Sequence, residues 1–433
     1  MDLDVTNAAS RRALPVAALV AAAWIGAWSG KHWLADHRIE SEQLKLMKSA
    51  AGLEPGNAEA WDRVGRFEQY DFANADPAQA IADYLRAVRD DPHSAHYWMD
   101  LASAYEMTGD ASRAREAYEQ ARSVYPASAE VAWSFGNFLL RQQRFSEGYA
   151  QIRQAVRGDR SLLQIAISRA WRSNQDVQQL LDHVLPADPD AYFQALDFFA
   201  SIQQIDPALE VWSRLRALQY SFALPRSFAF IEGLIRADRS QDASRVWREA
   251  LAGAGAPFSE PASQSLIWNG DFAHDFANGG LDWRWPPPPI SVSMGFETAP
   301  ASPGGRALRL DFGGGSNVAL SQPEQYVPVE PHRKYRFHAY LRTEHITTES
   351  GVRFSIYDPR HPDALNLLSD NLTGTNPWTA ADLEVDTGSA THFLIVRVLR
   401  NPSRLFDSKL SGSAWIAGVS LTPAESPLGQ TPR

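Results

Sequence analysis

The sequence predicts a multidomain protein in which a membrane-anchored α-solenoid precedes an antiparallel β-sandwich. Three observations lead to this fold class. An uncharged apolar run covers Ala13–Ser29, a pattern of small and aromatic residues recurs between about residues 41 and 252, and short alternating apolar runs begin at about residue 264. Because the three patterns follow one another without overlap, each one is assigned to its own domain.

The composition excludes several functional classes. The chain has 433 residues, which suits two or three domains, and a formal net charge of −10. That charge argues against a nucleic-acid partner, since a basic field is needed to displace counterions from phosphates. The chain contains no cysteine, so disulfide scaffolds, thiolate zinc sites and cysteine nucleophiles are all excluded.

The apolar run near the N-terminus predicts a transmembrane helix or signal-anchor over residues 13–33, after an N-terminal tail of residues 1–12. Lys31 follows the run, and Trp28 and Trp33 suit the interface between lipid and water. The run is slightly short for a hydrocarbon core of about 30 Å. A cleaved secretory signal peptide and a buried helix are the alternatives, and we favour the retained anchor.

The orientation of this anchor in the membrane is predicted from the basic residues on either side of the run. Arg11 and Arg12 stand directly before the run, as in a signal-anchor, but more basic residues follow the run than precede it, so counting alone does not favour an outside C-terminus. We predict a single-pass protein of the inner (cytoplasmic) membrane, with the bulk of the chain periplasmic or otherwise extracytoplasmic.

A helical repeat fills residues 41–252. Four residues of one helix recur 34 residues later with unchanged spacing: Ala80, Tyr84, Ala87 and Pro92 return as Ala114, Tyr118, Ala121 and Pro126. The alanines let two antiparallel helices approach closely, the tyrosines fill the gap to the next pair, and each proline ends a helix. Weaker copies follow. No pair can bury its apolar face alone, so the pairs are expected to stack into a solenoid.

The segment from Trp98 to Pro126 resembles the tetratricopeptide repeat family. It carries the pattern Trp-x2-Leu-Ala-x2-Tyr and then Ala-x3-Tyr-x2-Ala-x4-Pro. The resemblance implies a concave groove that holds a peptide or a protein partner. The residues that it places in this groove are Asp62, Arg66, Gln69, Met99, Ser103, Glu106, Trp133, Asn137 and Arg141. The family's carboxylate clamp of Lys and Asn is absent, because Asp62 and Ser103 stand at clamp positions, so a chaperone C-terminal tail is not the expected ligand.

Helical periodicity ends at a linker, residues 253–263, that is rich in Ala, Gly, Pro and Ser. Residues 264–424 then show alternating runs separated by turn clusters, which predict an antiparallel sandwich. The expected strands are Arg306–Phe312, Arg333–Thr343, Gly351–Tyr357, Ala381–Val385, His392–Leu399 and Ala414–Leu421. Residues 425–433 are predicted to form a disordered tail.

The sandwich segment resembles the galactose-binding-like jelly rolls, especially carbohydrate-binding modules. The residues that carry the resemblance include Asn269-Gly270-Asp271-Phe272 at its start and Trp415-Ile416-Ala417-Gly418-Val419 at its end. It implies a glycan site of aromatic rings with polar partners, for which the candidates are Trp285, Tyr326, Arg336, His338, Tyr340, Tyr357 and Asp358. Acidic residues that bind a structural calcium in that family are replaced by Ala273 and Ala417, so we expect no metal site.

No catalytic constellation is recognisable: a phosphate loop ending in Gly-Lys-Ser/Thr, a His-Glu-x-x-His motif and a Gly-x-Ser-x-Gly elbow are all missing from the sequence. We predict a non-enzymatic, cofactor-free adaptor whose solenoid binds a protein and whose sandwich binds a polysaccharide or a second surface. By analogy of architecture, this suggests bacterial envelope or exopolysaccharide assembly. The alternatives are a purely structural assembly protein of a membrane complex without sugar binding and, less favoured, an undetected or degenerate carbohydrate-active enzyme.

Overall fold

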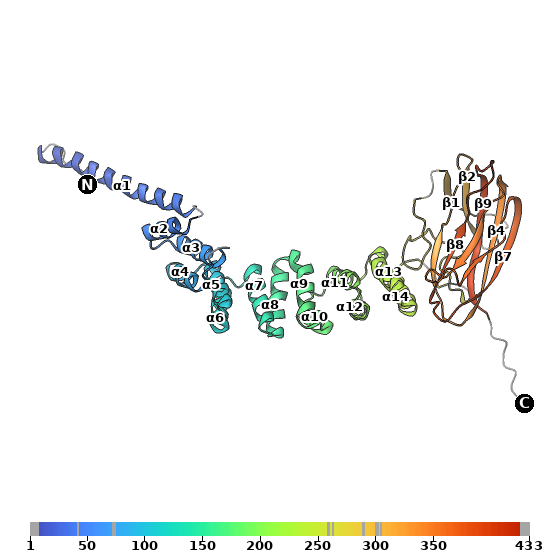
Figure 1. The fold of residues 1–433 in the computed structure, drawn as a ribbon, viewed down its shortest axis with the longest axis horizontal. Coiled ribbons are helices and arrows are strands. Elements are labelled where there is room, and N and C mark those ends of the chain that lie inside the picture. The colour runs from blue at the N-terminus through green and yellow to red at the C-terminus, as the bar shows by residue number, and fades with distance from the viewer. Residues whose placement is uncertain are drawn as a thin grey trace, which may run out of the picture. The chain divides into compact units, whose positions relative to one another are not determined.

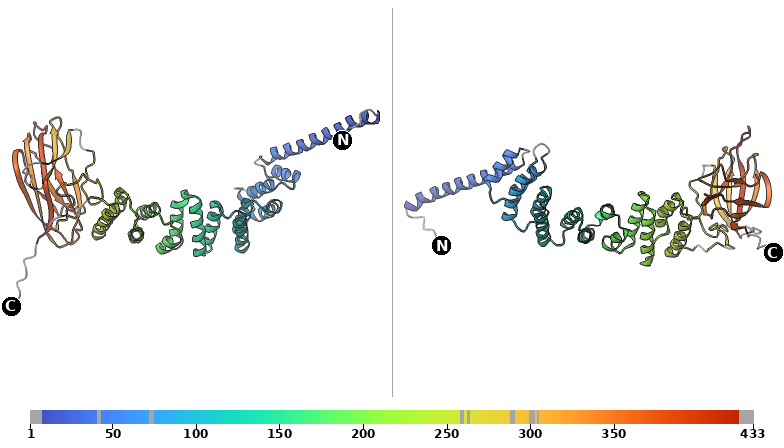
Figure 2. Two further views of the ribbon diagram at one scale, coloured as in Figure 1. Left: turned by 180° about the vertical axis from the view of Figure 1, so that it is seen from behind. Right: turned by 60° about the horizontal axis from the view of Figure 1, so that its bottom comes forward.

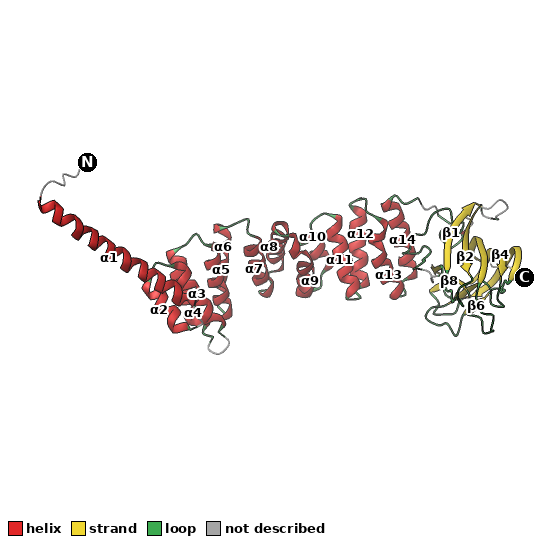
Figure 3. Cartoon of the chain, turned by 90° about the horizontal axis from the view of Figure 1, so that it is seen from above, coloured by secondary structure: helices red, strands yellow, loops and turns green. Residues whose placement is uncertain are grey.

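A computed structural model of the chain describes residues 8–40, 43–71, 75–257, 260–261, 264–287, 291–298, 303 and 305–424. Helices precede strands along the chain (Figure 3). The chain divides into two compact units, Met1–Pro186 and Ala187–Arg433, so that the division falls within the helical region. The predicted tail 425–433 and part of the predicted linker lie outside the described residues.

The first unit is a series of helices joined by short turns (Figure 1). Its helices are α1 (Ala8–Ile39), α2 (Leu44–Leu53), α3 (Ala58–Tyr70), α4 (Pro77–Asp90), α5 (Ala95–Met107), α6 (Ala111–Val124), α7 (Ala129–Arg141), α8 (Phe145–Gly158), η1 (Arg160–Leu162, a 3₁₀ helix), α9 (Leu163–Asn174) and α10 (Val177–His183). Polar caps mark several starts, since Asn57, Asp76 and Ser128 each accept a hydrogen bond from the backbone N–H three residues later. The local sequence therefore sets where these helices begin.

Helix α1 is one continuous helix in both views of Figure 2. In the described part of the chain, no helix is both long enough and apolar enough to cross a membrane. A spanning helix needs about 20 mostly apolar residues, whereas the stretch from Pro15 to Gly30 is rich in alanine and glycine and is followed by Lys31 and His32. The prediction of a single-pass inner-membrane protein, anchored by residues 13–33 with its bulk periplasmic, is therefore wrong.

Successive helix pairs repeat the same contact. The indole N–H of Trp61 donates to the carbonyl oxygen of Pro55 at 3.0 Å, and that of Trp98 donates to the carbonyl oxygen of Pro92 at 3.0 Å. The small residue Ala80 is fully buried, as the predicted close approach of two helices requires. The predicted solenoid-like helical region is confirmed, and its regularity follows from these recurring residue types.

The second unit contains the remaining helices and all the described strands. Its helices are α11 (Pro189–Ser201), α12 (Ile205–Ala217), η2 (Leu224–Ser227), α13 (Phe228–Arg236) and α14 (Ser240–Ala254). Its strands are β1 (Val292–Thr298), β2 (Arg306–Gly313), β3 (Glu324–Pro328), β4 (Lys334–Ile346), β5 (Arg353–Tyr357), β6 (Asn366–Leu368), β7 (Gly374–Asp386), β8 (Phe393–Leu399) and β9 (Ser411–Pro423). They form a five-stranded sheet in the order β1-β2-β9-β4-β7 and a four-stranded sheet in the order β3-β8-β5-β6.

All pairings between these strands are antiparallel, and one apolar core includes side chains from both sheets. Strand β4 shows the predicted alternation: Tyr335, Phe337, Ala339 and Leu341 are buried, and the residues between them are more exposed. Each predicted run contributes to a strand. Strands β1, β3 and β6 were not predicted, because they are short or weakly alternating.

The last helix pair packs directly on the start of the sandwich, inside the second unit. The ring centroids of Trp247 and Trp268 lie 6.1 Å apart in an edge-to-face arrangement. Arg284 forms an ion pair with Glu232 of α13 at 2.5 Å. The ring contact and the ion pair therefore join these helices to the start of the sandwich.

Candidate functional site

All nine predicted groove residues lie on α3, α5 and α7, and several of them join neighbouring repeats through hydrogen bonds. We call the side of these helices that carries Asp62, Arg66, Gln69, Ser103, Glu106, Trp133 and Arg141 the groove face, although Asp62 and Gln69 are themselves buried there. Between α3 and α5, Arg66 Nε donates to Asp100 Oδ2 at 2.7 Å, and Gln69 Nε2 donates to Ser103 Oγ at 3.0 Å.

Between α5 and α7, Arg141 binds both carboxylate oxygens of Glu106, at 2.5 and 2.8 Å. Both groove-face arginines thus engage a carboxylate of the same chain. A peptide carboxylate would have to compete with these internal pairs, so the arrangement favours ligands that are recognised by other groups.

Two predicted groove residues are mainly structural. Met99 is buried and packs against Ala121 and Val131, which assigns it to the core of the repeats. Asn137 is also buried, and its amide donates to the carbonyl oxygen of Trp133 at 2.8 Å. The ring of Trp133 itself is half-buried and remains accessible.

The groove face carries a cluster that sequence reasoning missed. Asp62, His96 and Asp100 each offer a ligand atom, and these three atoms lie within 4.8 Å of one another. His96 and Asp100 are one helical turn apart on α5, a spacing that places both on one side of that helix. The sequence could not indicate that Asp62, from the preceding repeat, would face them.

The electrostatics of this cluster are unusual. Asp62 is buried, with 3% of its surface exposed, and its Oδ1 has no hydrogen-bond donor among the described residues. Burial, together with the neighbouring charge of Asp100, raises the pKa of Asp62 to about 8, although Arg66 opposes the shift. Two carboxylates in contact need a proton or a cation between them.

In the sandwich, the structure separates the predicted glycan-binding residues. Tyr326 and Tyr357 lie on the four-stranded sheet, where the guanidinium groups of Arg284 and Arg397 cover their rings at 4.6 and 4.4 Å. Trp285 lies outside the strands and packs partly against the core. These rings are therefore already engaged by side chains of the protein.

Asp358 has a structural role in the geometry observed. It is buried, and it accepts hydrogen bonds from Thr391 Oγ1 at 2.8 Å and from the backbone N–H of Arg360 at 2.8 Å. Burial alone would raise the pKa of Asp358, but these and neighbouring hydrogen bonds lower it below its usual value. The carboxylate holds its loop together and is not directed at an open surface.

Arg336, His338 and Tyr340 lie on the other sheet, along the more exposed face of β4. His338 Nδ1 lies 2.7 Å from an oxygen of Asp382, and the His338 ring meets Tyr340 edge-to-face at 4.7 Å. The seven predicted glycan residues thus do not form one site, because they are divided between the two sheets and loops; on β4, the half-buried ring of Tyr340 lies beside the polar groups of His338 and Asp382.

Comparison with known proteins identifies the repeats. The sequence profile of the tetratricopeptide repeat family matches residues 69–121 and 108–161. Residues 69–161 are tetratricopeptide repeats. The matched part contains the Trp98–Pro126 segment and most of the groove face. No curated protein matches the chain.

Solved structures that match the chain include other proteins with tetratricopeptide repeats. One is the first TPR of Spaghetti (RPAP3) bound to an HSP90 peptide, at 17% identity over 27% of this chain and 90% of that one, with a TM-score of 0.25. Another is YrrB, described as having an unusual peptide-binding site, at 13% identity over 50% of this chain and 95% of that one, with a TM-score of 0.24. The enzymatically active domain of a bacteriophage CBA120 tailspike protein matches at 13% identity over 37% of this chain, with a TM-score of 0.29, and the match spans only 22% of the tailspike chain.

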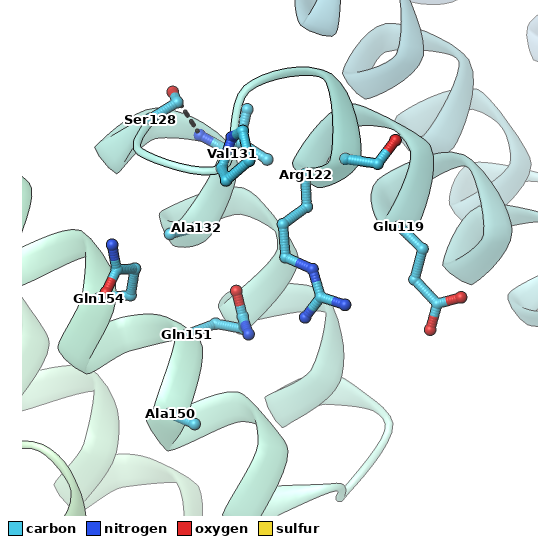
Figure 4. A pocket seen from close by; sticks show the side chains of 10 residues that line it. Glu119, Arg122, Ser128, Val131, Ala132, Ala150, Gln151 and Gln154 are labelled. Carbon is cyan, nitrogen blue, oxygen red and sulfur yellow. Dashed lines mark hydrogen bonds between the residues drawn. The ribbon is translucent and has the colours of Figure 1, made fainter.

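The tetratricopeptide repeats also border an open hollow of about 470 Å³ between α6, the start of α7 and α8. Figure 4 shows the side chains of Arg122 and Gln151 extending into the same space, with the Ser128–Val131 hydrogen bond at its rim. None of the groove-face residues lines this hollow. Pro126 of the repeat pattern is among its lining residues, but the pattern by itself does not predict a hollow there.

Proposed function

We propose that the chain is a non-enzymatic adaptor whose groove face binds a polypeptide partner. The tetratricopeptide repeats support this proposal, since the family implies peptide or protein binding by the first helices of its repeats. The observation that carries it is the alignment of groups from α3, α5 and α7 on one face, where hydrogen bonds between repeats hold them in place. Such preorganised side chains lose little conformational freedom when a ligand binds.

The geometry also favours one kind of peptide recognition. Arg66 and Arg141 are each paired with a carboxylate of the chain itself. Neither arginine is therefore free to bind the C-terminal carboxylate of a peptide. The half-buried ring of Trp133 provides an apolar contact beside them. We therefore propose an internal peptide segment as the ligand, bound through hydrogen bonds and through contact with Trp133.

A phage-displayed random peptide library panned against the full chain tests this function. We expect the enriched peptides to bind Trp133→Ala at least tenfold more weakly than the unaltered chain, a loss of about 1.4 kcal/mol. Trp33→Ala is the matched control, because this tryptophan is 67% exposed and belongs to α1, which carries none of the groove-face residues. Peptides that bind Trp133→Ala and the unaltered chain equally well would contradict the proposal.

A second candidate function belongs to the sandwich. We propose that the exposed face of β4 binds a glycan, or failing that a second protein surface, because Tyr340, His338 and Asp382 lie together there. A glycan array probed with the full chain should show binding that Tyr340→Ala abolishes and that Tyr357→Ala, on the other sheet, leaves intact. An array without any bound glycan would contradict glycan binding by this face.

A further inference from the structure

We propose that Asp62, His96 and Asp100 bind a divalent transition-metal ion, with Zn²⁺ as the best match to their chemistry. The three donors come from the first helices of two consecutive repeats, Asp62 from α3 and the other two from α5. One ligand atom of each lies within 4.8 Å of the others, a separation that a shared ion can close with small side-chain movements.

Burial points to a ligand more strongly than proximity does. The Oδ1 atom of Asp62 is shielded from solvent and receives no hydrogen bond from the described residues. An unsatisfied buried carboxylate oxygen is costly, because desolvation is not repaid by any donor. The other two members of the cluster do not supply this donor: the Asp100 carboxylate can only accept while ionised and already accepts from Arg66, and His96 Nε2 lies 3.4 Å from Asp100 Oδ2.

The donor set selects the class of ion. Two carboxylate oxygens with one imidazole nitrogen suit zinc and its neighbours better than Ca²⁺ or Mg²⁺, which prefer oxygen ligands alone. Three protein ligands leave a fourth tetrahedral position for water. His96 has 45% of its side chain exposed, so this open position would face solvent on the groove face.

Arg66 is the group that a metal ion must displace. Its Nε lies 2.7 Å from Asp100 Oδ2 and 3.3 Å from Asp62 Oδ2, where it supplies the positive charge. With 40% of its side chain exposed, the guanidinium can move toward solvent and leave both carboxylates to the ion. A bound ion would then join α3 to α5 and stabilise the stacking of the first two repeats.

Isothermal titration of Zn²⁺ into the EDTA-treated full chain tests the site. We expect one stoichiometric site, with affinity reduced at least tenfold in each of Asp62→Asn, His96→Gln and Asp100→Asn. Arg66→Gln should bind Zn²⁺ more tightly than the unaltered chain, since it removes the competing cation. Ca²⁺ should bind this site more weakly than Zn²⁺.

His93→Gln is the matched control, because this exposed histidine is close in sequence to His96 but lies outside the cluster. Circular dichroism in EDTA will show whether each variant is folded, and His96→Gln alters only an exposed side chain. The absence of a stoichiometric site, or equal affinity in His93→Gln and the three cluster variants, would overturn the proposal.

Discussion

The free energy of unfolding of the sandwich is expected to fall by about 4 kcal/mol between about pH 4 and pH 7 because of Asp282, and Asp282→Asn is expected to abolish this change. Asp282 is fully buried, its Oδ2 accepts a hydrogen bond from the backbone N–H of Ala277 at 2.6 Å, and its Oδ1 has no donor among the described residues. Burial raises the pKa of this carboxyl group to about 7, in spite of the hydrogen bonds that lower it. Each pH unit of such a shift is worth about 1.4 kcal/mol.

The direction of this effect follows from proton binding. Between about pH 4 and pH 7 the folded chain keeps the Asp282 proton, whereas the unfolded chain has lost it. The free energy of unfolding therefore falls as the pH rises through this window, and the stabilisation is fully present only below pH 4. Asn cannot titrate, so Asp282→Asn should lack this slope.

The effect is measured by urea denaturation of the full chain at several pH values, with unfolding monitored by near-ultraviolet circular dichroism. Asp370→Asn is the control, since this exposed aspartate of the sandwich should leave the slope of the unaltered chain unchanged. A slope in Asp282→Asn equal to that of the unaltered chain would show that Asp282 does not carry the pH dependence.

Gly280→Ala is expected to destabilise the second unit by about 3 kcal/mol. Gly280 adopts a positive φ of +62°, and a Cβ there would lie 2.3 Å from the ring of Trp247. Trp247 of α14 is fully buried against the start of the sandwich, so its ring has no room to move aside. Steric overlap in a packed core costs about 1–3 kcal/mol, and the left-handed backbone adds about 1 kcal/mol for a residue with a Cβ.

Gly374→Ala separates these two contributions. Gly374 has a similar φ of +69°, but no atom of the described residues lies within 4 Å of the position that an added Cβ would occupy. This control should therefore lose only the backbone contribution of about 1 kcal/mol. Equal denaturation midpoints for the two variants would show that the contact between Gly280 and Trp247 is not tightly packed.

The sequence predicted the features that depend on local periodicity. The recurrence of Ala80 as Ala114 identified the helix pairs, and the alternation along Tyr335–Leu341 identified the buried face of β4. Both patterns arise because a helix or strand presents its residues at a set interval, whatever it packs against. The same reasoning failed for residues 13–33, where an uncharged run was taken for a sufficiently apolar one.

Which polar groups meet was decided only by the tertiary structure. Asp62 and Asp100 belong to different repeats, and Arg284 and Tyr326 meet through the pairing of a loop with β3. Such contacts depend on the stacking angle between helix pairs and on strand order. Neither of these can be predicted from the spacing of residue types along a short stretch of sequence. The sequence by itself therefore determined the repeating units and their buried faces, whereas the packing of distant segments decided the composition of the groove face and the division of the glycan candidates between two sheets.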